Sequence, residues 1–196
     1  MQIWAGLGNP GPQYARHRHN VGFMAVDAIA DRFDASPPGK KFQGWMQEAR
    51  IGGDKVILLK PATFMNESGR SLRAAMDFYK LCPADITVFY DELDIAPFKL
   101  KVKRGGGAAG HNGIRSTIDH IGAEFRRVRL GIGHPGHKDR VTGYVLGNFA
   151  KAEIDDLADL LGAVAAEAAW LAKGDDVRFM NDVAVRLNGW LNMLPG

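Results

Sequence analysis

Two histidines, each followed by an asparagine, are the residues in this sequence best suited to chemistry: His19-Asn20 and His111-Asn112. Asp91 lies between them, at the end of an apolar run. Imidazole exchanges a proton near neutral pH, and an asparagine amide can hold a peptide group or a water molecule without adding charge. A carboxylate can raise the basicity of an imidazole and select its tautomer. These residues predict hydrolysis by a general base, with an imidazole that is uncharged at rest and water as the attacking group.

A metal-dependent hydrolase is the alternative enzyme, because another histidine is close by in the sequence. His17 precedes His19 by two residues, so on an extended chain both could lie on one face and join Asp91 and His111. Zinc or manganese accepts such ligands. The sequence contains no His-Glu-x-x-His helix or similar spacing, which favours the metal-free interpretation.

Serine and cysteine are weak candidates for a nucleophile. Ser68 lacks the glycine two residues earlier that a nucleophile elbow requires, and capping of a helix by Asn66 or Ser68 explains it better. Cys82 is the single cysteine, stands directly before Pro83, and is expected to be a small buried thiol in a reducing cytosol.

The segment from Gly6 to Gly11 formally matches the glycine fingerprint of dinucleotide-binding folds. In those folds a helix opens at the third glycine, but Pro12-Gln13-Tyr14 follows here and helical periodicity starts only near Val21. A tight turn that presents Asn9 to a cleft is therefore the better interpretation.

Two sets of cationic residues flank the Gly105–Gly107 cluster. They alternate with other residues, so that each set would share one face of a strand: Lys99, Lys101 and Lys103 in the first, Arg127 and Arg129 in the second. Lysines on edge strands also protect sheets from aggregation, which is the alternative explanation. Their position beside His111 favours contacts with the phosphates of a polyanionic substrate.

A non-catalytic RNA-binding module could use the same cations. Such modules usually display aromatic platforms on which bases stack. Only Phe98 adjoins the lysine set, and aromatic residues make up 9% of the chain. This composition favours an enzyme.

The composition is that of an ordinary cytoplasmic protein with one domain spanning residues 1–196. The chain has 46% hydrophobic residues and a net charge of +3, with neither a long apolar run for a membrane span nor a secretion signal. Residues 151–176 hold two lysines and seven acids, which leaves 23 basic and 15 acidic residues elsewhere. This asymmetry predicts a cationic face and an acidic helix turned away from it.

Apolar patterns alternate between strand and helix periods, which predicts an α/β single-domain sandwich with a twisted mixed β-sheet surrounded by helices. The expected strands are Gln2–Leu7, Lys41–Ile51, Lys55–Lys60, Ile86–Tyr90, Phe98–Val102 and Arg126–Ile132. The expected helices are Val21–Phe33, a segment from Asn66 or Ser68 to Lys80, Asn112–Ile121, Ala152–Lys173 and Val177–Leu191.

Taken together, these segments resemble the bacterial-type peptidyl-tRNA hydrolases nearly from end to end. The matching blocks occur in the right order: Gly8-Asn9-Pro10-Gly11, Tyr14, Arg18-His19-Asn20-Val21-Gly22, Lys60-Pro61, Thr63-Phe64-Met65-Asn66, Ser68-Gly69, Asp91-Glu92-Leu93-Asp94, Gly105-Gly106-Gly107, Gly110-His111-Asn112-Gly113 and Arg129-Leu130-Gly131-Ile132-Gly133-His134-Pro135. The resemblance implies a monomeric enzyme without cofactor or metal. Its implied substrate is peptidyl-tRNA, contacted at the acceptor stem and 3′ end, and its implied reaction is hydrolysis of the ester between the peptide and tRNA.

The resemblance also implies a role for each matching residue. His19 would activate water, Asp91 would orient His19, and Asn9, Asn66 and Asn112 would share the binding of peptide, water and oxyanion. The other implied residues are Tyr14, Met65 and His111 for substrate binding, and Lys101, Lys103 and Arg129 for tRNA phosphates.

Gly105–His111 would form a mobile flap. Two departures from the family pattern, His17 and Ala108-Ala109, put a local hydrogen bond and the mobility of that flap in question.

Overall fold

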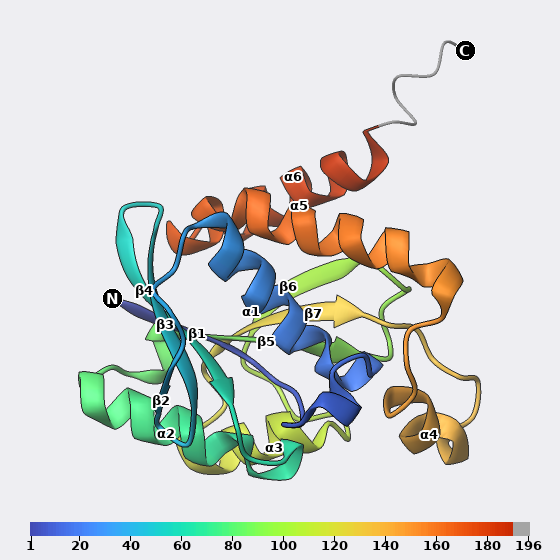
Figure 1. Ribbon diagram of the computed structural model, residues 1–196, viewed down its shortest axis with the longest axis horizontal. Helices are drawn as coiled ribbons and strands as arrows, with labels where there is room; N and C mark the ends of the chain where they lie inside the picture. The colour runs from blue at the N-terminus through green and yellow to red at the C-terminus, as the bar shows by residue number, and fades with distance from the viewer. Residues whose placement is uncertain (190–196) are drawn as a thin grey trace.

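The computed structural model describes residues 1–189, whose centre is a seven-stranded mixed β-sheet (Figure 1). Its strands are β1 (Gln2–Gly6), β2 (Gly39–Lys41), β3 (Gly44–Ile51), β4 (Asp54–Pro61), β5 (Ile86–Glu92), β6 (Leu100–Arg104) and β7 (Arg126–Gly131). They lie in the order β2-β3-β4-β1-β5-β7-β6. The pairs β1–β4, β1–β5 and β5–β7 are parallel, whereas β2–β3, β3–β4 and β6–β7 are antiparallel. The parallel strands β4, β1, β5 and β7 therefore end at one common edge.

Helices cover both faces of the sheet. Helices α1 (Val21–Arg32), α5 (Ile154–Ala172) and α6 (Asp176–Asn188) share one hydrophobic core with the sheet, and α2 (Ser68–Tyr79) and α3 (Asn112–Ile121) pack on the other face. Figure 1 shows α5 and α6 on the opposite side of the sheet from α2 and α3. Short helices complete the loops: η1 (Pro12–Tyr14), η2 (Arg18–Asn20), η3 (Met65–Glu67), η4 (Pro83–Asp85), η5 (Lys138–Arg140), α4 (Val141–Val145) and η6 (Lys151–Glu153).

Alternation along the central strands explains why two separate cores form. Ile3 and Ala5 of β1 point into the α2/α3 core, whereas Trp4 between them points into the α1/α5/α6 core. All three side chains are fully buried. A strand buried on both faces reads as a continuous apolar run, which is the pattern found in β1 and β5.

The predicted α/β sandwich with a mixed sheet is confirmed, with changes at several element ends. The expected strand Lys41–Ile51 is broken by a tight turn, because Phe42 and Gln43 both adopt positive φ angles of 56° and 53°. The strand expected from Phe98 starts at Leu100, since Phe98 has a φ of 62°. The expected end of the last helix, at Leu191, lies outside the described residues.

Cys82 corrects the expectation of a buried thiol. Its side chain is exposed beside η4, where Cys82 Sγ lies 3.2 Å from Asp85 Oδ2. Among residues 1–189, none of the helices is both long and apolar enough to cross a membrane.

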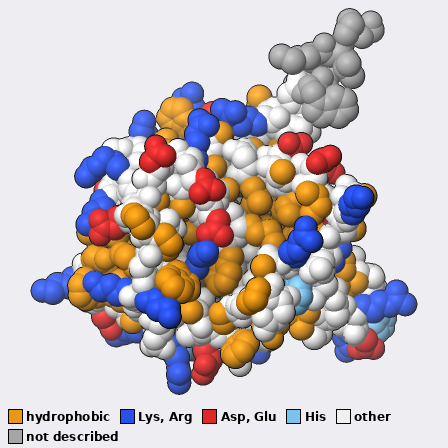
Figure 2. Space-filling model, in the orientation of Figure 1, with side chains coloured by type: hydrophobic (Ala, Val, Ile, Leu, Met, Phe, Trp, Pro, Cys, Tyr) orange, Lys and Arg blue, Asp and Glu red, His pale blue; other side chains and the backbone are white. Residues whose placement is uncertain are grey.

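The face that carries α1 and α5 does not have a single sign of charge. Figure 2 shows acidic and basic side chains interspersed there around an exposed apolar area. A hollow between α1 and α5 is lined by Met24, Phe149 and Leu157, with Arg16 and Lys151 among its polar residues. The cationic residues expected to bind a polyanion, Lys101, Lys103 and Arg129, lie on β6 and β7 at one edge of the sheet.

Candidate active site

The site forms where β1 and β5 end side by side. Two close approaches of backbone, both of which require glycine, bring the start of α1 onto these strands. A Cβ on Gly22 would lie 2.2 Å from the carbonyl oxygen of Phe89, and one on Gly6 would lie 2.2 Å from that of Gly22. Because η2 directly precedes α1, this packing places His19 over the end of β5.

Asp91 hydrogen-bonds two histidines at once. The strand expected to end at Tyr90 continues to Glu92, so Asp91 is held by the sheet itself and is only 3% exposed. His19 Nδ1 lies 2.8 Å from Asp91 Oδ2, and His111 Nε2 lies 2.8 Å from Asp91 Oδ1. The two imidazole rings are 5.0 Å apart between centroids. The hydrogen bond expected between Asp91 and a histidine is confirmed, and a second one is added.

The remaining nitrogens of the two rings have different surroundings. His111 caps α3, and its Nδ1 accepts a hydrogen bond from the backbone N–H of Ile114 at 3.2 Å. Its Nε2 must then carry the proton that is donated to Asp91, so both nitrogens are engaged. His19 donates from Nδ1 to Asp91, and its Nε2 has no hydrogen-bond partner among the described residues. His19 is therefore the histidine with a free basic nitrogen.

Burial and charge act in opposite directions on this pair. Burial lowers the pKa of His19, but the charge and the hydrogen bond of Asp91 outweigh it, so the pKa lies above the ordinary 6.5. Burial alone raises the pKa of Asp91, but His111 and His19 hold it well below its usual range. Asp91 is thus ionised throughout the neutral range. The sequence analysis expected an imidazole that is uncharged at rest, but the charge of Asp91 favours the imidazolium form.

Asn9 is fixed in place by Asn20, to which the family resemblance gave no role. The side chain of Asn20, only 2% exposed, accepts from the Asn9 backbone N–H at 2.9 Å and donates to the Asn9 carbonyl at 3.0 Å. Asn9 Oδ1 in turn accepts from the backbone N–H of Met65 at 2.8 Å. The oxygen of the Asn9 amide therefore bonds to protein, which leaves the Nδ2 donor for a ligand. Asn20 could have been suspected from its position directly after His19.

Comparison with known proteins identifies the family of this chain. Residues 3–189 match the family model described as peptidyl-tRNA hydrolase. The chain belongs to the peptidyl-tRNA hydrolase family. It is 74% identical over 189 residues to the peptidyl-tRNA hydrolase of Sphingopyxis alaskensis, covering 96% of this chain and 100% of the relative. Identity to that of Zymomonas mobilis is 64%, covering 95% and 98%.

A solved structure shows the same fold. The crystal structure of peptidyl-tRNA hydrolase from Acinetobacter baumannii superposes with a TM-score of 0.88 at 40% sequence identity. The match covers 93% of this chain and 94% of that one.

Three segments carry the residues to which the family resemblance assigns substrate binding. Met65 is buried at the start of η3, and a Cβ on Gly113 would lie 2.5 Å from its sulfur, so α3 packs directly against it. Asn66 and Asn112 are exposed at the starts of η3 and α3. Tyr14 is half-buried, with its ring edge-on to the rings of His17 at 5.4 Å and Phe64 at 6.4 Å between centroids.

Ser68 does not have the expected capping role. It is the first residue of α2, and its hydroxyl donates to the carbonyl of Met65 at 2.8 Å instead of accepting from a helix N–H. Because the side chain is fully buried, it supports the η3 turn beneath Met65.

The cationic sets are only partly arranged as their alternation in the sequence predicted. Lys101 pairs with Arg129 and Lys103 with Arg127 across β6 and β7, whereas Lys99 lies before the strand. Lys101 is exposed, Lys103 and Arg129 are half-buried, and Arg129 is 3.7 Å from Glu92. Burial lowers the pKa of Lys103, and the charges of Arg129 and Arg127 lower it further. Arg127 is fully buried, so the expectation that it contacts phosphate is wrong.

One cluster has the composition of a metal site. Ligand atoms of His19, Asp91 and His111 lie within 4.8 Å of one another. His17, expected in such a site, is absent from the cluster: it pairs with Asn148 through the backbone and packs its ring on Tyr14. A metal would have to displace both imidazole N–H groups from Asp91, so the arrangement fits a hydrogen-bonded triad better.

Proposed function

We propose that this chain hydrolyses the ester between a peptide, or an N-blocked amino acid, and the 3′ ribose of tRNA, with His19 as the general base. The observation that carries the proposal is the hydrogen bond from His19 Nδ1 to the buried Asp91, which leaves Nε2 as a free basic nitrogen. Family membership supports the substrate class. The protein would act as a cytoplasmic monomer that frees tRNA during translation.

The proposed reaction needs one proton acceptor and a set of neutral donors. His19 Nε2 takes a proton from water as the water oxygen attacks the ester carbonyl carbon. The resulting imidazolium is stabilised by the ionised Asp91, and it returns the proton to the ribose oxygen as the acyl–oxygen bond breaks. Asn9 Nδ2 donates to the water or to the developing oxyanion, and Asn66 and Asn112 bind the peptide backbone.

The chemistry of the substrate explains why these groups would suffice. A ribose hydroxyl is a better leaving group than a peptide amine, so the ester needs less activation than an amide. A general base contributes about 10²–10⁴-fold, and one oxyanion donor about 10²–10³-fold. We therefore infer that no metal or cofactor takes part.

The test is turnover of an N-acetylated aminoacyl-tRNA, followed by release of the labelled amino acid. Purified protein should cleave it with and without a chelator. Loss of activity on chelation, restored by zinc or manganese, would favour the metal-dependent alternative at His19, Asp91 and His111. No cleavage under any of these conditions would reject the proposed function.

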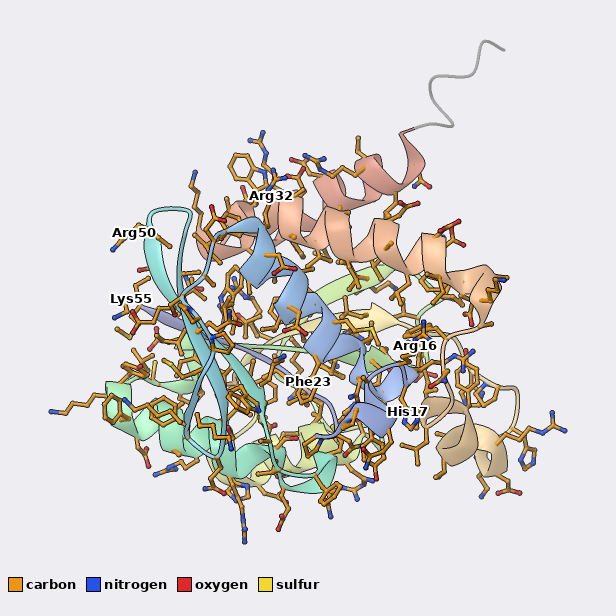
Figure 3. All side chains as sticks on the ribbon, in the orientation of Figure 1. Arg16, His17, Phe23, Arg32, Arg50 and Lys55 are labelled. Carbon is orange, nitrogen blue, oxygen red and sulfur yellow. The ribbon has the colours of Figure 1, made fainter. Side chains whose placement is uncertain are left out.

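Lys101, Lys103 and Arg129 would bind the phosphates of the acceptor stem. Each phosphate contact releases counterions, so removing one cation should weaken binding of deacylated tRNA and reduce its salt dependence by about one unit of slope. Lys103→Gln is the variant of choice. Arg50→Gln is the matched control, because Arg50 lies on β3, near the opposite edge of the sheet from β6, and is seen well to the left of His17 in Figure 3. Equal salt slopes for Lys103→Gln and the unmodified protein would contradict this contact.

A further inference from the structure

Arg127 is a buried cation without a carboxylate partner. Its side chain is fully buried, and none of the salt bridges among the described residues includes it. Its neighbour Arg126 is buried to a similar degree but pairs with Asp176 at 2.8 Å. Burying an unpaired charge is costly, and an apolar residue of similar size would often be as stable. Arg127 therefore needs an explanation that Arg126 does not.

Carbonyl oxygens from two separate loops surround the Arg127 guanidinium. Nη1 donates to Gly107 O at 2.6 Å, and Nη2 donates to Gly106 O at 2.6 Å and to Ala123 O at 3.2 Å. Its Cζ lies 4.5 Å from the centre of the Phe125 ring, which adds a cation–π contact. Bonds from a charged donor to carbonyls are stronger than bonds between neutral groups.

These two loops are the two ends of α3. Gly106 and Gly107 lie in the loop that leads into the helix, and Ala123 follows its last turn. One side chain thus ties the loop before α3 and the residue after its C-cap to β7. The helix carries His111 at its N-cap and Asn112 at its first position.

We propose that Arg127 is a positioning residue that holds α3 so that His111 stays on Asp91 and Asn112 stays at the cleft. Lysine cannot replace it, because one ammonium cannot reach all three carbonyls in the plane of a guanidinium. The clamp ends at Gly107, so any movement of the expected flap is restricted to residues 108–110, where Ala109 and Gly110 have positive φ.

Arg127→Lys tests the proposal, with Arg126→Lys as a matched control on the same strand. Histidine labelled with ¹⁵N reports the tautomer of His111 directly. In Arg127→Lys, we expect its two nitrogen shifts to move toward a tautomer average, and amides 108–111 to exchange faster. Turnover should fall about tenfold while affinity for deacylated tRNA is kept. Arg126→Lys should lower the melting temperature and leave the His111 spectrum and turnover unchanged.

Unchanged His111 shifts in a folded Arg127→Lys protein would overturn the proposal, whatever the turnover. If that variant fails to fold, the test is made on the unmodified protein by NMR. Its Arg127 guanidinium protons should exchange slowly with solvent and show couplings through hydrogen bonds to labelled carbonyls of Gly106 and Gly107. Rapid exchange without such couplings would equally overturn it. The turnover readout rests on the proposed function, but the histidine spectrum does not, so failure of the two ideas can be told apart.

Discussion

His19 and His111 contact the same carboxylate at the same distance, yet their surroundings fit them for different work. Both rings lie 2.8 Å from Asp91, and both are nearly buried. His111 uses its second nitrogen to accept the N–H of Ile114 within its own helix, whereas His19 keeps its second nitrogen free. Contact with an acid therefore does not identify a general base. The partner of the opposite nitrogen is more informative, and on that ground we propose His19 as the base and His111 as a donor that shares the charge of Asp91.

His19→Ala should cause the largest loss. Removing a general base costs more than about 10²-fold in turnover, while the fold and the affinity for tRNA should be kept because the ring is not in either hydrophobic core. Single-turnover rates and circular dichroism of the variant check this. Near-normal rates would show that another group is the general base. They would also contradict the different roles proposed for His19 and His111.

Asp91→Asn should cause the second largest loss of turnover, roughly 10- to 100-fold, because the neutral amide no longer stabilises the imidazolium of His19. The substitution preserves the size of the side chain, so the loss should lie in kcat more than in KM. A change confined to KM would mean that Asp91 acts on the substrate and not on the base.

The pH dependence should show the raised pKa of His19. A base works only when deprotonated, so kcat/KM should fall about tenfold per pH unit below a midpoint that lies above 6.5. In Asp91→Asn the cause of the rise is removed and burial remains, so the midpoint should move to lower pH. A midpoint that stays in place would show that another group titrates.

His111→Asn should have the smallest effect, since asparagine can still cap α3. One hydrogen bond to Asp91 is lost, on the order of 1 kcal/mol, which corresponds to roughly a fivefold change in rate. Asp91 then attracts the His19 proton more strongly, so the activity midpoint should move to higher pH, opposite to Asp91→Asn. A loss as large as that of His19→Ala would make the two histidines equal partners.

Local sequence patterns predicted most elements of the fold and the hydrogen bond between Asp91 and a histidine. Apolar periodicity predicted α3 at its observed bounds, and placed Asp91 beside a cleft because β5 reads as a continuous apolar run. It failed where tertiary packing decides. Phe42 and Gln43 adopt positive φ angles that neither residue favours, which broke a predicted strand.

Alternation alone also could not separate Arg127 from Arg129. The two share a face of β7, and only the loop that covers one of them makes it a buried clamp instead of a surface cation. The same limit applies to Asn20. Its sequence position is suggestive, but its bonds to Asn9 follow from the turn that brings the two backbones together.

The pair of bonds between Asn20 and Asn9 has a consequence for how a substrate would be received. His19 and Asn20 are consecutive residues, so the base and the amide donor of Asn9 belong to one rigid unit that is assembled when the chain folds. The conformational entropy of positioning these groups is lost when the protein folds, before any substrate binds. The binding energy of the substrate therefore remains available to align the scissile bond.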